Sequence, residues 1–469
     1  MNADDVLMSA LKRKMPGRLL LAAMLLLSST VLYFVERADG GDWANWAHGL
    51  GMIALIYYLR RFYVDRKAVF LTGFYPIYYS VGMLLSSALV SGGIYMFEIA
   101  QFGNQNGIFW VMLAYFVLGL ETSAIGYQFA RHVHIGQGVL RFSWASTKFV
   151  IYALTATALA ASSVVFLLYG GPVLQGVDRV TFWRQYVPSF MSFIPTLVLQ
   201  SFFFAAYYYL WARRDGRHSL LLLGVLLGYL IATWLVLGQK FSAFIIFMNA
   251  WFVLLPGIFP NFKVRRSHII PLAAVILILA ASVVVSYLIA DREEAFALAR
   301  IALQAQLLWS VFSNDTAQIL LPQYWECYFG CGQFLYGIDF ISYKYLPSEL
   351  YSHYLESGTV LSGFMPSLSI LAFGISASLF IHVIMSFALG FVQAKIVSAI
   401  SKKNMIYGFL LFKLLSNLTL IWFAAMASAI PGLIVTLAVI IFYHILFKYL
   451  PLREQAMLGG SSLSMARAK

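Results

Sequence analysis

The sequence predicts an all-α integral membrane protein, and three observations carry that prediction. The 469 residues are 61% hydrophobic and 11% charged, with a mean hydropathy of +0.80, whereas soluble domains carry about 25% charged residues. Apolar stretches close to the roughly 20 residues that a membrane-crossing helix needs cover nearly the whole chain. The net charge of +13 lies mainly between those stretches, so it indicates membrane orientation and not nucleic-acid binding.

The apolar stretches form one continuous series without a soluble domain or an internal repeat. We therefore predict a single polytopic membrane domain over residues 1–469 with about twelve transmembrane helices. The predicted spans lie near residues 18–35, 43–60, 68–90, 108–130, 149–169, 189–211, 219–237, 242–260, 269–290, 366–390, 405–425 and 428–448.

Basic residues predict the orientation, because positive charge is retained on the cytoplasmic side of a membrane. They cluster at 12–18, 60–67, 131–148, 213–217, 263–266 and 395–403. Both termini are accordingly expected in the cytoplasm, with a short cytoplasmic tail over 449–469. The basic residues left on the outer side are Arg37, Arg179, Arg184, Lys240, Arg292, Arg300 and Lys344.

Two outer loops follow from this orientation, a short one over 170–188 and a long one over 291–365. Loops as long as the second usually serve a purpose of their own. Within it, a short helix is predicted from Ser348 to Glu356, with Glu349, His353 and Glu356 at i, i+4 and i+7. One face could then hold an imidazole beside a carboxylate. The alternative is an ordinary solvated amphipathic turn.

The short loop carries two arginines that depart from the inward bias of positive charge. Arg179 and Arg184 flank Trp183, and guanidinium groups suit phosphate or diphosphate recognition. Alternatively, both arginines anchor the chain at lipid headgroups. Lys240, in the turn 238–242, is expected on the same side, either as a third cation of the site or as an interfacial lysine that closes a hairpin.

Some polar residues fall inside the predicted spans. Glu121 lies near the middle of its span, where a charge costs about 2.5 to 3.5 kcal/mol. We expect it to be functional or else paired with another helix, near Lys413 or Asn417. The histidines in spans are expected to be packed and hydrogen-bonded; they are His48, His382 and His444.

Three local motifs suggest a family, namely Gly176–Trp183 (GVDRVTFW), Gly238–Ser242 (GQKFS) and Arg300–Trp309 (RIALQAQLLW). Together with the overall topology they resemble the oligosaccharide repeat-unit polymerases, the Wzy class of O-antigen and capsule polymerases. These are integral membrane glycosyltransferases of the GT-C type that use lipid-linked sugars.

The resemblance implies transfer of a growing glycan from undecaprenyl diphosphate onto an incoming undecaprenyl-diphosphate-linked repeat unit, at the periplasmic face of the bacterial inner membrane. It implies no metal or other cofactor, and membrane lipid and a chain-length regulator protein as further partners. An O-antigen ligase is a close alternative, and a lipid-linked oligosaccharide flippase or transporter is a more distant one.

The resemblance and the loop chemistry together assign expected roles. Loss of a lipid diphosphate needs cations to stabilise the charge on the leaving group, and these would be Arg179, Arg184, Lys240 and Arg300, with Arg300 also in a catalytic role. His353 is the expected general base, with Glu349 or Glu356 as its orienting partner or as a rival base. The expected sugar-binding residues are Gln304, Trp309 and Tyr351.

Overall fold

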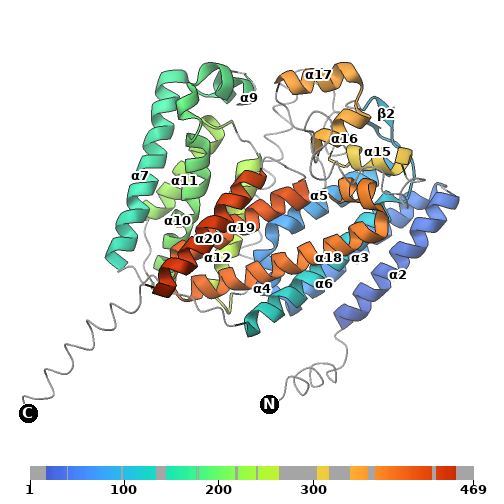
Figure 1. Cartoon of the computed structure of the whole chain (residues 1–469), viewed down its shortest axis with the longest axis horizontal. Helices are drawn as coiled ribbons and strands as arrows, with labels where there is room; N and C mark the ends of the chain where they lie inside the picture. Colours follow the sequence, from blue (N-terminus) through green and yellow to red (C-terminus); the bar gives the residue numbers. More distant parts are fainter. Residues whose placement is uncertain are drawn as a thin grey trace, which may run out of the picture.

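The computed structural model describes residues 17–39, 41–96, 99–133, 144–175, 177, 179–216, 220–238, 241–262, 304–315, 338–357, 365–424 and 429–449. This part of the chain is almost entirely helical (Figure 1). The strands it contains are β1 (Tyr95–Met96) and β2 (Gln101–Phe102), which pair antiparallel.

Long apolar helices occupy the predicted spans that the structure describes. Seven of the described helices are long and apolar enough to cross a membrane, which confirms an all-α membrane protein. They are α2 (Gly17–Ala38), α5 (Phe74–Ser91), α6 (Ile108–His132), α7 (Trp144–Tyr169), α10 (Ile194–Arg214), α18 (Met365–Ser401) and α19 (Met405–Ala424). The remaining predicted spans correspond to α3 (Trp43–Asp65), α11 (Leu220–Leu235), α12 (Phe241–Ile258) and α20 (Ile430–Tyr449), except 269–290, which lies outside the described residues.

The predicted span 68–90 is divided into two helices. The short α4 (Lys67–Thr72) ends at Gly73, and α5 begins at the next residue. A Cβ atom at Gly73 would lie 2.8 Å from the Val69 carbonyl oxygen and 3.2 Å from Nε2 of Gln393. Only a residue without a side chain fits so close to both neighbours.

The helix α18 is broken near its start. Gly374 has φ 79° and ψ 169°, a conformation that is essentially restricted to glycine. The Ser378 hydroxyl donates a hydrogen bond to the Pro366 carbonyl at 3.4 Å, so the first arm of α18, residues 365–373, folds back along the segment that follows the break. Hydrophobicity alone predicted an unbroken span, because both sides of the break are apolar.

The helices α6 and α18 pack closely through small residues. A Cβ atom at Gly390 would lie 1.9 Å from the Ser123 carbonyl oxygen, and one at Gly126 would lie 2.2 Å from the Phe387 carbonyl oxygen. The Ser123 hydroxyl also donates to the Ser386 carbonyl at 2.8 Å. Small side chains allow two membrane helices to approach until their backbones touch.

The bundle has two distinct ends (Figure 1). At one end lie the segments 170–193, 304–315 and 338–357, which we call the loop end. At the opposite end, which we call the basic end, the helices finish with cationic residues that include Arg66, Arg131, Arg213, Arg214 and Lys402.

Candidate functional site

The segment between α7 and α10 forms one part of the loop end. It contains α8 (Pro172–Gln175), α9 (Arg179–Thr181), the π-helix η1 (Phe182–Tyr186) and the 3-10 helix η2 (Ser189–Met191). Phe182 is fully buried and its ring stacks on Tyr186 with centroids 6.0 Å apart. With this anchor in place, Arg179 and Arg184 are both exposed at the surface.

The turn that follows α11 packs against the same segment. Gly238 has φ 63°, and a Cβ atom there would lie 2.7 Å from Cγ of Pro172 and 3.1 Å from Cβ of Arg179. The chain therefore enters the turn 238–242 directly beside Arg179. Lys240 itself lies outside the described residues, as does Arg300.

The helix α15 (Gln306–Asp315) is attached to the loop that precedes α6. The Trp309 indole N–H donates to the Asn104 carbonyl at 3.1 Å, and the Asn106 amide donates to the Ser313 hydroxyl at 2.8 Å. Trp309 is only 3% exposed, so its predicted role in sugar binding would require the indole to be uncovered first. Gln304, in the turn before α15, is half-buried.

The predicted helix around His353 is present. It is α17 (Ser348–Ser357), which confirms the range expected from the sequence. Glu349, His353 and Glu356 are all exposed, so one face of α17 presents an imidazole and two carboxylates at the loop end. Among the described residues, no three His, Cys, Asp or Glu side chains are grouped closely enough to hold a metal ion.

A neighbouring helix, α16 (Ile338–Tyr345), supplies residues that the sequence reasoning missed. The rings of Tyr343 and Tyr351 meet edge to face, with centroids 5.5 Å apart and planes at 70°. Asp339 lies in the first turn of α16, where partial burial raises the pKa of its carboxyl group. Burial, then the charge of Asp339, also raises the pKa of the Tyr351 phenol. These residues could have been found from the spacing Asp339-x3-Tyr343, which places a carboxylate and an aromatic ring on one helix face just before the predicted helix 348–356.

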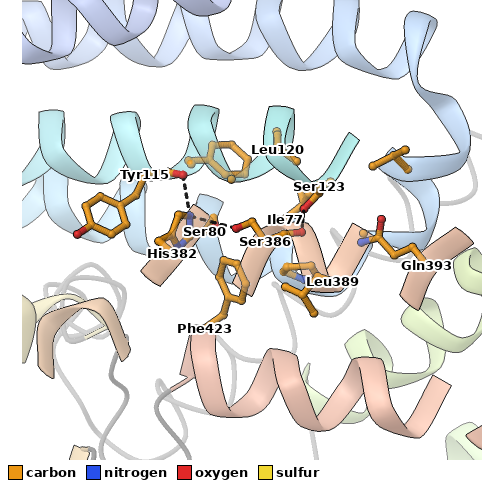
Figure 2. Close-up of a pocket in the computed structure, with 15 residues that line it drawn as sticks. Ile77, Ser80, Tyr115, Leu120, Ser123, His382, Ser386, Leu389, Gln393 and Phe423 are labelled. Carbon is orange, nitrogen blue, oxygen red and sulfur yellow. Dashed lines mark hydrogen bonds between the residues drawn. The ribbon is translucent and has the colours of Figure 1, made fainter. Parts of the chain in front are cut away.

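Inside the bundle, a cavity opens between α4, α5, α6, α18 and α19 (Figure 2). It contains about 350 Å³ of empty space, including its opening. The residues that line it include His382, Ser80, Ser386 and Gln393, and none of the lining residues in the described part of the chain is charged. The Gln393 side chain is 1% exposed, and its Oε1 has no hydrogen-bond partner among the described residues. Such a cavity suits water or a small neutral group better than a diphosphate.

His382 has both ring nitrogens engaged at this cavity. The Trp422 indole N–H can only donate, and it does so to Nδ1 of His382 at 2.8 Å. The proton of the neutral ring is therefore on Nε2, which donates to the Tyr115 carbonyl at 2.9 Å. This arrangement joins α6, α18 and α19 and leaves no ring nitrogen available for proton transfer.

Glu121 is paired, but not with the partners expected from the sequence. Its carboxylate lies 3.0 Å from Nη2 of Arg18 and accepts a hydrogen bond from the Tyr58 hydroxyl at 2.9 Å. The expectation that Glu121 pairs near Lys413 or Asn417 was wrong, and the Asn417 amide instead donates to the Thr436 hydroxyl at 3.3 Å. Helix order in space, which hydrophobicity does not reveal, decides which partner is near.

A second buried carboxylate holds the start of α6. Glu36 accepts hydrogen bonds from the Trp110 indole at 2.8 Å and from the Gly107 backbone N–H at 3.1 Å, and it pairs with Nε2 of His48 at 2.8 Å. His444 likewise bonds the Tyr407 hydroxyl at 3.0 Å. The prediction that His48, His382 and His444 are packed, hydrogen-bonded residues is confirmed.

One comparison with known proteins gives a match. A family of unknown function (DUF6418) matches residues 333–433. No curated protein and no solved structure matches the chain. The matched segment contains α16, α17, α18 and α19, so it carries both the exposed histidine of α17 and the buried histidine of the cavity, and this chain is similar to that family over these helices.

Proposed function

We propose that this chain is a multi-pass glycosyltransferase of the bacterial inner membrane. It would transfer a growing glycan from undecaprenyl diphosphate onto an undecaprenyl-diphosphate-linked repeat unit, as O-antigen and capsule polymerases do. The observation that supports this most is the exposure of Arg179 and Arg184 at the same end of the bundle as His353 of α17. Cations and a candidate base at one membrane face are what this reaction requires.

The proposal includes the finer topology. The chain would cross the membrane about twelve times, with the basic end in the cytoplasm and the loop end in the periplasm. The cationic helix ends at Arg66, Arg131, Arg213 and Lys402 support this orientation. Lipid-linked sugars would then reach the loop end from the outer leaflet.

The reaction can be written for the residues of the loop end. A hydroxyl oxygen of the acceptor sugar attacks the anomeric carbon of the donor glycan and forms the new glycosidic bond. The hydroxyl proton passes to His353, oriented by Glu349 four residues before it or Glu356 three residues after it. The bond between the anomeric carbon and the diphosphate oxygen breaks, and its electron pair leaves with undecaprenyl diphosphate. Arg179 and Arg184, with Lys240 and Arg300, would stabilise that charge.

A deletion strain tests the reaction class. Loss of a polymerase should leave lipopolysaccharide that carries a single repeat unit, whereas loss of an O-antigen ligase should leave bare core. The ladder pattern on a gel separates the two. Normal ladders in the deletion strain would reject both enzymes.

The diphosphate role is tested by Arg179→Ala. A charge-assisted hydrogen bond contributes about 1.5 to 3 kcal/mol, so polymerisation should slow by about 10- to 150-fold at unchanged protein levels in the membrane. Arg37→Ala is the matched control, because Arg37 is another exposed arginine near the loop end. Full-length ladders from Arg179→Ala would refute the role.

A lipid-linked oligosaccharide flippase is the alternative from another class. The ionisable groups inside the bundle favour it, because transporters place such groups within their spans; they are Glu36, His48, Arg18 and Glu121. However, these groups pair with one another, Arg18 with Glu121 and His48 with Glu36, as groups that hold helices together do. Loss of a flippase should trap lipid-linked repeat units on the cytoplasmic leaflet, where a membrane-impermeant oxidant of sugars does not reach them in intact spheroplasts.

A further inference from the structure

The surface of α16 carries a carboxylate and an aromatic ring on one face. Asp339 and Tyr343 are four residues apart and therefore neighbours on the helix surface. Both are exposed, Tyr343 to 56%, whereas Ile338, Phe340 and Ile341 between and beside them are buried. The buried residues fix α16 on the bundle, so its exposed face is held in a definite position.

The neighbouring α17 adds a second ring to this face. Tyr351 is half-buried and its ring meets that of Tyr343 edge to face at 5.5 Å. Tyr343 therefore has Asp339 beside it on α16 and Tyr351 in ring contact from α17, which places the three side chains on one surface. The result is a surface of two tyrosine rings with a carboxylate beside them, on the hairpin formed by α16 and α17.

This combination matches the chemistry of a neutral sugar. A pyranose ring has an apolar C–H face that packs on an aromatic ring, and its hydroxyl groups donate to a carboxylate through strong charge-assisted hydrogen bonds. A phosphate group would instead be repelled by Asp339. The loop end thus separates two chemistries, with cationic Arg179 and Arg184 on one segment and an anionic aromatic surface on another.

We propose that Asp339, Tyr343 and Tyr351 form a glycan-binding site that holds the terminal sugar of the acceptor repeat unit. The identification of the sugar as an acceptor rests on the proposed function, whereas the binding of a sugar does not. Asp339 accepts hydrogen bonds from sugar hydroxyls, and the tyrosine rings pack on the sugar face. His353 is on the same hairpin, two residues along α17 from Tyr351 and therefore on a different face of that helix.

Sugar binding can be measured on the full-length chain in phosphatidylcholine nanodiscs. The probes are unlinked hexoses, N-acetylhexosamines and disaccharides of both, observed by saturation-transfer difference NMR. Signals from the ring C–H protons of at least one sugar are expected. They should disappear in Tyr343→Ala and Tyr351→Ala and return in Tyr343→Phe and Tyr351→Phe, which retain the rings.

Asp339→Asn should weaken the binding of that sugar by about tenfold, since a charge-assisted hydrogen bond is replaced by a neutral one. Two controls should bind normally. Tyr95→Ala removes another exposed tyrosine, on β1, and Asp215→Asn removes an exposed carboxylate at the basic end.

Three results would overturn the site. One is the absence of a signal from every sugar, and another is a signal that persists in both alanine variants. The third is loss of sugar binding when phosphatidylglycerol is added to the nanodiscs, which would mean that lipid headgroups occupy the surface. The proposed function fails separately, because a deletion strain with normal ladders rejects the polymerase even if the sugar still binds.

Discussion

The loop end and the interior cavity each contain a histidine, and the two are used in opposite ways. His382 is 1% exposed and bonds Trp422 through one ring nitrogen and Tyr115 through the other. His353 is exposed on α17, with the ring of Tyr354 6.0 Å away. His382 thus joins helices inside the bundle, whereas His353 and the carboxylates on its face of α17 are open to the surface. Function is therefore better sought at the loop end, and changes in the two regions should have different consequences.

The largest effect is expected where α6 and α18 touch. Gly390→Leu would force a side chain into the Ser123 backbone, which lies 1.9 Å from the position of a Cβ atom. Overpacking typically costs about 1 to 3 kcal/mol, and here the obstacle is rigid backbone, so folded protein should be lost. The yield of monodisperse protein in detergent measures this.

Gly224 in α11 provides the matched control, because a Cβ atom there meets nothing within 4 Å. Gly224→Leu should leave the yield unchanged. If Gly390→Leu were produced and purified as well as this control, the close packing of α6 against α18 would be disproved.

The next effect concerns the interior histidine. His382→Ala leaves the buried Trp422 N–H without its acceptor, which costs about 1 to 3 kcal/mol, and removes the second hydrogen bond to the Tyr115 carbonyl. The thermal unfolding midpoint should fall, and the activity per folded molecule should be retained. A variant that unfolded normally but lost activity would give His382 a direct role in the reaction.

The converse is expected for the histidine at the loop end. His353→Ala should lower the polymerisation rate by about 10²- to 10⁴-fold, the usual contribution of a general base, without changing the unfolding midpoint. Ladder length and thermal unfolding are measured on the same preparation. Retained activity would transfer the role of base to Glu349 or Glu356.

The smallest effect concerns pH at the hairpin of α16 and α17. Because burial raises the pKa of Asp339, its carboxylate should become protonated at a higher pH than that of an ordinary aspartate. Sugar binding should weaken as the pH falls through this raised pKa and recover as the pH rises. Titration of the NMR signals between about pH 4 and 7 measures this. In Asp339→Asn the sugar signals should be independent of pH. If this variant showed the same pH dependence as the unmodified protein, Asp339 would be excluded as the cause of that dependence.

The elements of the fold could be predicted from local sequence to a large extent. Apolar runs marked the helices, and capping chemistry marked α17 from Ser348 onward. The break at Gly374 could not be predicted, because a glycine inside an apolar run is equally compatible with a continuous helix. The close approach at Gly73 could not be predicted either, since one of the atoms beside it belongs to Gln393 on a distant helix.

The contacts of the candidate site were less predictable. The exposure of Arg179, Arg184 and His353 agrees with their place in predicted loops. Trp309 instead is buried and bonds the Asn104 carbonyl, about 200 residues earlier in the chain. Asp339 and Tyr343 were missed because the ring that meets Tyr343, that of Tyr351, belongs to another helix. Pairings across helices need the spatial order of the bundle, which periodicity does not contain.

The two buried pairs that attach α2 to α6 have a consequence for biosynthesis. Glu36 of α2 accepts a hydrogen bond from the Trp110 indole, which lies 74 residues further along the chain in α6. Arg18 of α2 forms an ion pair with Glu121, which is also in α6. At about 5 to 20 residues per second, a ribosome needs about 4 to 15 s to translate that interval. For that time the carboxylate of Glu36 lacks the Trp110 N–H that it accepts in the finished bundle. The helix α2 would thus complete its buried contacts only after α6 has been translated.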